Sequence, residues 1–363
     1  MAVVVVCAAL GWSVRHVTAP AVRGWRPGTG TSGSADRLHV RTFGSGDPVV
    51  VLLHGMIAAG NCFGAGFDPL GSCGTVVVPD LLGFGYSAAQ PGPLTAADHC
   101  AALDGMLSAL GFHDRPLVVV GHSMGGALAV RWAATRVPQV QAVVTFCAAL
   151  YRTRAEADEG ARRMGLFEAI LAGDGRLPRA VCAWMCRFRT IASWVAVAIR
   201  PDVPVALARS GVQHTWDSYR GSLIALIRSA EWEPALRRLA EAGVAVTLAE
   251  GSRDSVPVSS RAATLAAGLP GLAWAQYLGA GHQLPITDGA WCATVVAEAA
   301  GAGPAPVRLR PGSRVTSFPP EADAPATGDT VIGTGSAPAP TPSDRVSRTT
   351  TIRISRLSGS CMT

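Results

Sequence analysis

The sequence contains no lysine, so all 31 of its basic residues are arginines. Together with 25 acidic residues they give a formal net charge of +6 and an isoelectric point of about 9.0. The arginines are scattered along the chain, and this spread favours a solvated basic surface over a nucleic-acid-binding site. We therefore expect no nucleic acid among the partners of this protein.

A disulfide framework is also missing. The nine cysteines are an odd number, and only Cys182 and Cys186 lie close in sequence. Two cysteines one helical turn apart, with no second Cys or His pair nearby, are weak evidence for a zinc site. We expect mostly reduced packing thiols, a cytoplasmic protein, and neither a metal nor a cofactor.

Long hydrophobic runs are scarce. Residues 2–12 are apolar, but this stretch is too short to span a bilayer and no basic segment precedes it. We expect a poorly ordered N-terminal extension over residues 1–36 and no stable membrane span. Peripheral membrane association through the apolar start is the alternative. The sequence does not indicate an oligomeric state.

The most informative segment that is present runs from Leu117 to Ala127, an apolar stretch followed by Gly-His-Ser-Met-Gly-Gly. It predicts a strand, a sharp turn at Ser123 and a helix. Gly121 and Gly125 flank the serine because a Cβ at either position would crowd the turn. Such a turn presents a reactive hydroxyl at the N-terminus of a helix, where the dipole favours negative charge.

Two further buried strands lead into polar or glycine-rich loops. Residues 48–53 are followed by His54-Gly55, and residues 76–79 by Asp80-Leu-Leu-Gly-Phe-Gly-Tyr-Ser87. With the serine turn, these segments resemble the α/β-hydrolase family over roughly residues 38–150 and 230–302. The resemblance implies an α/β fold with a mostly parallel, doubly wound sheet and a Ser, Asp or Glu, His order of catalytic residues.

The triad order can be followed in this chain. Asp254 comes after a strand-like run that ends near Gly251, and His282 comes after a second run over residues 272–278. The resemblance implies that Ser123 is the nucleophile, His282 the base and Asp254 the acid that orients it. Glu250 is the alternative acid, and we rank it below Asp254 because it lies within the strand end.

The remaining polar residues near these loops receive supporting roles. The resemblance implies that His54 braces the oxyanion loop through its ring, and that the backbone amides of Met56 and Met124 form the oxyanion hole. We expect Asp80 to hold the loop after its strand and His122 to pack within the turn.

About ninety residues separate the predicted sixth and seventh strands, where a bare connection needs only a few tens. We expect a helical cap over residues 151–230, with helical stretches at 152–172, 180–199 and 211–227, between core segments 37–150 and 231–302. Its aromatic residues predict an apolar substrate pocket. The candidate substrate-binding residues are Trp184, Trp194 and Trp216. Residues 303–363 have the composition of a disordered tail.

These features predict a serine hydrolase that cleaves a small to medium apolar carboxylic ester or related acyl compound. The small-molecule acyl substrate is the expected partner. The serine at the turn argues against haloalkane dehalogenases and epoxide hydrolases, which resemble this pattern but use Asp there. Cleavage of a carbon–carbon bond, a thioester or a lactone, perhydrolysis, and a non-catalytic ligand-binding protein of the same fold stay open.

Overall fold

The structure is a computed structural model that describes residues 24–87, 92–200 and 203–301. The predicted tail over residues 303–363 and the first 23 residues of the predicted extension lie outside these described residues. The extension is wrong in its last part, because Thr31–Ala35 forms strand β1 and pairs antiparallel with the next strand. The polar Gly-Ser composition of this edge strand hid it from sequence reasoning.

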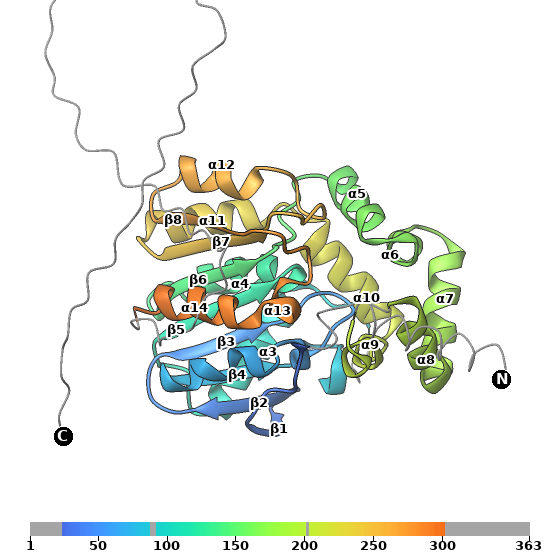
Figure 1. The fold of residues 1–363 in the computed structure, drawn as a ribbon, viewed down its shortest axis with the longest axis horizontal. Coiled ribbons are helices and arrows are strands. Elements are labelled where there is room, and N and C mark those ends of the chain that lie inside the picture. The colour runs from blue at the N-terminus through green and yellow to red at the C-terminus, as the bar shows by residue number, and fades with distance from the viewer. Residues whose placement is uncertain (1–23, 88–91, 201–202, 302–363) are drawn as a thin grey trace, which may run out of the picture. The chain divides into compact units, whose positions relative to one another are not determined.

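An eight-stranded sheet, mostly parallel as expected, forms the centre of the described fold (Figure 1). Its strand order is β1-β2-β4-β3-β5-β6-β7-β8, in which β2 runs antiparallel to both neighbours and the others pair in parallel. The strands after β1 are β2 (Leu38–Gly44), β3 (Val49–Leu53), β4 (Thr75–Pro79), β5 (Leu117–His122), β6 (Val140–Phe146), β7 (Ala245–Gly251) and β8 (Leu272–Tyr277).

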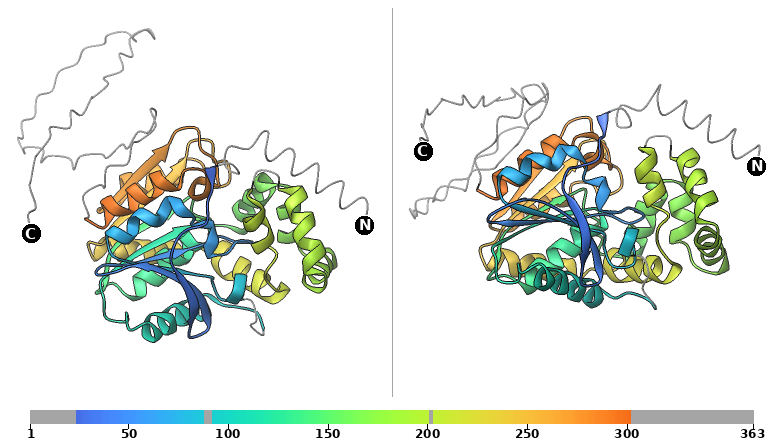
Figure 2. Two further views of the ribbon diagram at one scale, coloured as in Figure 1. Left: turned by 60° about the horizontal axis from the view of Figure 1, so that its bottom comes forward. Right: turned by 90° about the horizontal axis from the view of Figure 1, so that it is seen from below.

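Both faces of the central strands are buried. Successive side chains of a strand point to opposite faces, so Val49, Val51 and Leu53 of β3 join one core cluster, and Val50 and Leu52 join another. This explains why β3 is a continuous apolar run without polar alternation. Helices cover both faces of the sheet (Figure 2).

The covering helices divide between the two clusters. One face packs against α3 (Ala96–Ala109), α4 (Met124–Thr135), α11 (Trp232–Glu241) and α12 (Arg261–Gly268). The other packs against η2 (Ala65–Ser72) and α14 (Gly289–Ala299). Short turns complete the core as η1 (Gly60–Cys62), η3 (Gly85–Ser87) and α13 (Leu284–Thr287).

A helical cap stands between β6 and β7, and its helices gather at one side of the sheet (Figure 1). One helix, over residues 205–210, lies between the second and third expected stretches, and the other helices divide the three stretches. The described part of the cap therefore has six helical segments. They are α5 (Arg154–Met164), α6 (Leu166–Ala172), α7 (Arg176–Arg187), α8 (Arg189–Ile199), α9 (Val205–Ser210), and α10 (Trp216–Ser222) with its π-helical continuation η4 (Leu223–Ile227).

The breaks in the cap have local causes. Gly165 separates α5 from α6 at φ 151°, a conformation that L side chains rarely adopt. Phe188 separates α7 from α8 with non-helical torsions, and the two helices bend by 112° there. Pro178, in contrast, lies in the first turn of α7, where its missing N–H removes no helical hydrogen bond.

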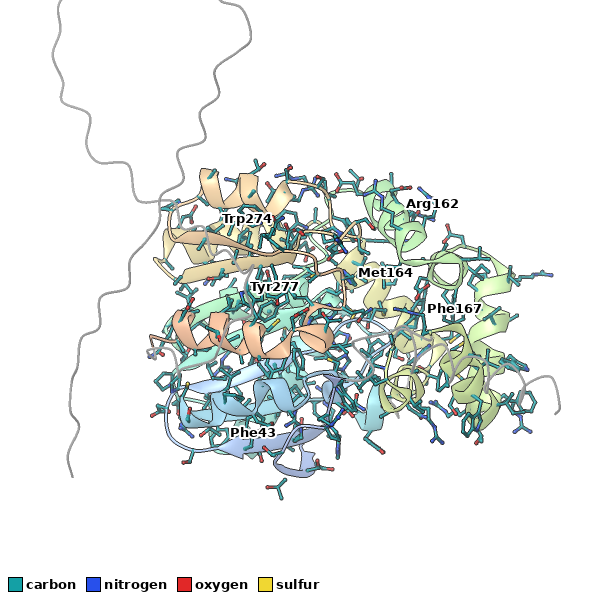
Figure 3. All side chains as sticks on the ribbon, viewed as in Figure 1. Phe43, Arg162, Met164, Phe167, Trp274 and Tyr277 are labelled. Carbon is teal, nitrogen blue, oxygen red and sulfur yellow. The ribbon has the colours of Figure 1, made fainter. Side chains whose placement is uncertain are left out.

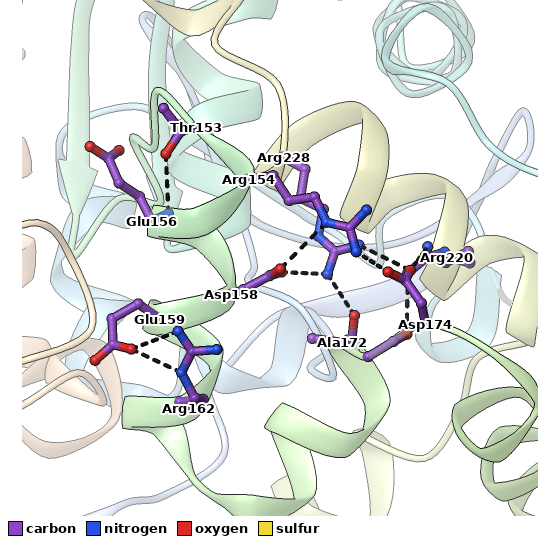
Figure 4. Close-up of polar contacts among 11 residues, drawn as sticks. Thr153, Arg154, Glu156, Asp158, Glu159, Arg162, Ala172, Asp174, Arg220 and Arg228 are labelled. Carbon is purple, nitrogen blue, oxygen red and sulfur yellow. Dashed lines mark hydrogen bonds and ion pairs between the residues drawn. The ribbon is translucent and has the colours of Figure 1, made fainter.

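A network of ion pairs ties the cap helices together (Figure 4). Arg228, which is buried, pairs with Asp158 of α5 and donates to the carbonyl oxygen of Ala172 at 2.6 Å. Arg220 of α10 pairs with Asp174 at 2.6 Å, just before α7. These contacts join segments far apart in sequence, so we expect the cap to behave as one packed layer.

Candidate active site

The three predicted triad residues come from three loops at one edge of the sheet. Ser123 follows β5, Asp254 follows β7 and His282 follows β8. These strands belong to the parallel part of the sheet, so their carboxyl ends meet at the same edge, where open α/β sheets bind their ligands.

The turn at Ser123 is strained in the way the glycine pattern predicts. Ser123 has φ 54° and ψ −117°, a conformation unfavourable for a side chain with a Cβ. A Cβ at Gly121 would collide with the carbonyl of Gly125, and one at Gly125 would collide with the carbonyl of Leu53. The two glycines therefore permit a turn that raises the serine above the sheet edge.

The three side chains form a continuous hydrogen-bonded chain. Ser123 Oγ lies 3.1 Å from His282 Nε2, and His282 Nδ1 lies 2.9 Å from Asp254 Oδ2. With Nδ1–H donated to the carboxylate, Nε2 is the acceptor for the serine hydroxyl. This is the arrangement in which an imidazole can take a proton from the serine.

The carboxylate of Asp254 is only 1% exposed. Burial favours its protonated form, but hydrogen bonds from His282, the Cys147 thiol and the Val256 amide outweigh burial, so the pKa of Asp254 is lowered. The Val256 N–H donates to Oδ1 at 2.9 Å. The acid is therefore ionised and fixed in orientation beside the imidazole.

Glu250, the alternative acid, faces elsewhere. Its carboxylate accepts from Trp274 Nε1 at 3.3 Å, and burial raises its pKa to about 6. Trp274 lies on β8, on the neighbouring strand (Figure 3). The geometry thus supports the ranking of Asp254 above Glu250.

The loop after β3 is braced through a buried imidazole. His54 Nδ1 donates to the Gly55 carbonyl at 2.8 Å, and Nε2 accepts from the Leu81 amide at 2.8 Å. Burial lowers the pKa of His54, which keeps the ring neutral and able to do both. Met56, two residues after His54, lines the same cavity as Ser123.

The second expected oxyanion donor is the amide of Met124, the first residue of α4. The N–H groups of a first helical turn have no acceptor within the helix, so this amide points out of the helix end beside Ser123. The oxyanion hole formed by the amides of Met56 and Met124 stays a prediction.

Asp80 and His122 have the supporting contacts that were expected. Asp80 accepts from the amides of Gly60 and Tyr86, at 2.7 and 2.8 Å, and so holds the loops on both sides of β4. His122 Nε2 donates to the backbone carbonyl of His282 at 2.9 Å. Burial, and then the nearby His282, lower the pKa of His122 to about 3.

His122, Cys147 and His282 lie within 4.8 Å of one another, close enough for a metal site by distance alone. Their donor atoms are otherwise engaged. His282 belongs to the triad, His122 bonds the His282 carbonyl, and burial raises the pKa of Cys147 well above its usual value, so its thiol stays protonated. A metal needs the deprotonated thiolate, which this environment disfavours.

A cavity of about 300 Å³ opens between the triad and the cap. Ser123 and His282 lie at its polar end, and Met164 and Phe167 at the corner of α5 and α6 line it from the cap side (Figure 3). Most other lining side chains are apolar, among them Ile57, Val181, Met185, Val195, Leu207, Leu223 and Ile286.

Only one of the three candidate tryptophans lines this cavity. Trp184 does so, but Trp194 and Trp216 are not among its described lining residues. Trp194 is 42% exposed with the Arg209 guanidinium 5.3 Å from its ring centroid, and Trp216 packs in a cap cluster with Tyr219. The described cavity therefore gives no support to a role of Trp194 or Trp216 in substrate binding, and that role stays a prediction.

Sequence reasoning missed three residues near the triad. Cys147 directly follows β6 at φ 51° and hydrogen-bonds Asp254 through its thiol. Tyr151 and Gln283 line the cavity. Little in the sequence identifies these three residues. Each is distinguished only by its position, one to five residues after a strand or a catalytic residue.

This fold and this arrangement define an α/β hydrolase. Residues 48–179 match the family model for the alpha/beta hydrolase fold.

Among curated proteins, the chain is similar to the lipase LipV of Mycobacterium tuberculosis, with 35% identity over 155 residues. The match spans 40% of this chain and 56% of that protein.

Solved structures share the fold at low sequence identity. A thermophilic esterase from Thermogutta terrifontis has a TM-score of 0.53 at 20% identity, and covers 72% of this chain and 92% of its own. The haloalkane dehalogenase DatA from Agrobacterium tumefaciens, as a mutant, has a TM-score of 0.57 at 19% identity, and covers 75% and 96%. These likenesses show the fold alone.

Proposed function

We propose that this protein is a serine hydrolase that cleaves a small to medium, largely apolar carboxylic ester through an acyl-enzyme on Ser123. The observation that carries the proposal is the 3.1 Å contact between Ser123 Oγ and His282 Nε2 at the polar end of an apolar cavity. A cavity of about 300 Å³ is at the small end of ligand sites, which favours a compact acyl group.

The proposed reaction begins when Ser123 Oγ attacks the ester carbonyl and its proton passes to His282 Nε2. Asp254 stabilises the imidazolium, and the amides of Met56 and Met124 donate to the oxyanion. Collapse of the tetrahedral intermediate expels the alcohol, which takes the proton from Nε2. Water then attacks the acyl-enzyme by the same route, releasing the carboxylic acid and restoring the Ser123 hydroxyl.

The name of one similar protein, the lipase LipV, supports ester cleavage over the alternatives. Thioester, lactone and carbon–carbon cleavage, and perhydrolysis, need the same serine, so a turnover screen across these substrates separates them. The free cysteines of the described residues, Cys62, Cys73, Cys100, Cys147, Cys182, Cys186 and Cys292, support a reducing compartment such as the cytoplasm.

The first prediction is that Ser123→Ala lowers kcat on a short p-nitrophenyl ester by about 10⁶-fold, because the nucleophile of a triad is lost. Ser108→Ala is the matched control, since Ser108 is exposed and its hydroxyl contacts the Asp104 carbonyl and the His113 ring, both away from the triad. Circular dichroism checks that both variants fold.

Covalent labelling by a fluorophosphonate gives a second readout for the same proposal. Wild type and Ser108→Ala should be labelled on Ser123, and Ser123→Ala should not. Unchanged turnover in folded Ser123→Ala would contradict the nucleophile. A wild type that resists the probe and turns over none of the screened substrates would instead indicate a ligand-binding protein.

A further inference from the structure

Two cap helices carry an exposed apolar stripe. Along α7 and α8, Trp184, Phe188, Ile191 and Trp194 are spaced four, three and three residues apart and are 42–46% exposed. The Trp184 and Phe188 ring centroids lie 6.1 Å apart, so the rings on α7 extend to the break before α8. Large apolar side chains gathered in this way on a surface mark an interaction site.

The same helices are basic and free of acid. Residues 175–200 contain five arginines and neither Asp nor Glu. Arg176, Arg179 and Arg187 are exposed, and within the described part of the chain none of them pairs with a carboxylate. The arginines of the neighbouring network, such as Arg220 and Arg228, are neutralised by aspartates (Figure 4). The positive charge of α7 is therefore left for a partner.

The charges and rings are placed together. The Arg187 guanidinium lies 5.6 Å from the Phe188 ring centroid, and the exposed Arg209 lies 5.3 Å from that of Trp194. Aromatic rings with arginine at their edge suit the boundary between lipid headgroups and acyl chains. In the described residues, no single helix is long and apolar enough to cross a bilayer, and α7 with α8 reaches that measure only as a pair bent by 112°.

The stripe is continuous with the active-site cavity. Val181, Trp184 and Met185 of α7 and Val195 and Ala196 of α8 line the cavity, so the same two helices form its wall and the exposed stripe. Trp184 belongs to both. An apolar molecule taken from a surface bound by the stripe would therefore have a short apolar path to Ser123.

We propose that α7 and α8 dock this protein on an anionic lipid surface, with Phe188, Ile191 and Trp194 at the acyl boundary and Arg176, Arg179 and Arg187 at the headgroups. The unneutralised charge favours an anionic bilayer over a neutral one. Binding to the bilayer does not depend on the proposed hydrolase activity, so the two proposals can fail separately.

The test is co-flotation of the full chain with vesicles of phosphatidylcholine alone and of phosphatidylcholine mixed with phosphatidylglycerol. Wild type should bind the anionic vesicles and be released by salt. The triple variant Arg176→Gln, Arg179→Gln and Arg187→Gln should bind about a hundredfold more weakly, since each arginine near an anionic surface contributes about fivefold.

Matched controls carry equal changes on the core. Arg37→Gln, Arg237→Gln and Arg238→Gln together remove the same charge, and Leu278→Ser removes an exposed apolar side chain outside the cap. Both controls should bind as wild type does. Phe188→Ser, Ile191→Ser and Trp194→Ser together should abolish binding but leave turnover of a soluble ester unchanged, because none of the three is among the described cavity-lining residues.

A spectroscopic readout guards against misfolding of the apolar variant. Brominated phosphatidylglycerol should quench wild-type tryptophan fluorescence, and the conservative variant Trp194→Phe should lose part of that quenching. Equal binding to neutral and anionic vesicles, equal binding by the arginine variant and its control, or no vesicle binding by wild type would each overturn the proposal. If wild type binds no vesicles, a protein would be the remaining candidate partner for the stripe.

Discussion

The identity of the carboxylate beside His282 is the question of most consequence among single residues. Asp254 and Glu250 lie four positions apart on the same strand end, yet only Asp254 hydrogen-bonds the imidazole. The difference arises in the turn after β7, where the Asp254 amide donates to the Gly251 carbonyl at 3.0 Å and the Arg253 amide to the Ala280 carbonyl at 2.9 Å. These bonds fasten the acid loop to the loop that carries His282.

We predict that Asp254→Asn lowers kcat by about 10⁴-fold, because the imidazole loses both its orientation and the charge that stabilises its protonated form. Glu250→Gln is the matched variant and should stay within a few-fold of wild type, since its carboxyl contacts Trp274. Steady-state kinetics on one ester decide between them. A larger loss in Glu250→Gln would show that the acid is assigned to the wrong residue.

The sequence predicted the residues of the turn and the triad because their constraints are local. A glycine on each side of Ser123 and a polar residue just beyond a strand are visible without coordinates. Cys147 could not be found in this way. Its thiol reaches Asp254 only because β6 and β7 are neighbours in the sheet, and strand order is not written in a short motif.

Among the elements, the cap shows what the spacing of apolar residues can and cannot predict. Apolar spacing predicted helices in the correct region, but the torsions at Gly165 and Phe188 that divide them were not predicted. The direction of each short helix follows from these breaks and from the ion pairs around Arg228. Spacing along one helix therefore could not tell which aromatic residues face the cavity.

The two tryptophans of α7 and α8 provide a paired test of cap specificity. Trp184→Ala should change the acyl-chain preference of kcat/KM by about 1 to 3 kcal/mol, because Trp184 lines the cavity. Trp194→Ala should leave that preference unchanged on soluble esters. The measurement is kcat/KM over a series of chain lengths. Equal shifts in the two variants would contradict the placement of these side chains.

Four buried imidazoles lower the stability of the folded domain at acid pH. Burial lowers the pKa of His99 and His214 to about 4 and of His122 to about 3, and it lowers that of His54 as well. Their ordinary value is 6.5, so below that pH the unfolded chain binds protons that the folded chain does not. Each imidazole then costs about 1.4 kcal/mol of stability per pH unit until its folded pKa is reached.

We predict that the melting temperature falls steeply as the pH drops from 6.5 toward 4. Burial raises the pKa of Glu250 to about 6 and raises that of Glu298 as well, and these two carboxyls act in the opposite direction to the four imidazoles. Thermal unfolding followed by circular dichroism between pH 8 and pH 4, at constant ionic strength, measures the effect. A melting temperature that stays constant from pH 7 to pH 5 would contradict it.

The α/β class and the mostly parallel sheet followed from the family resemblance, and the buried valine runs fit a sheet that is covered on both faces. The antiparallel start of the sheet was not predicted, because β1 is exposed and polar for four of its five residues.

The cap leaves the sheet after β6, and the chain returns from it through α11 to β7. Trp232 Nε1 at the start of α11 donates to the Tyr151 carbonyl at 2.8 Å, so the two attachment points of the cap are neighbours. The catalytic serine, acid and base all lie outside the inserted segment. Replacing the whole insertion need not move any of the three. The cap and the catalytic core can therefore evolve nearly independently. Related chains can differ in the substrate they bind and in the surface they dock on while keeping the same catalytic residues.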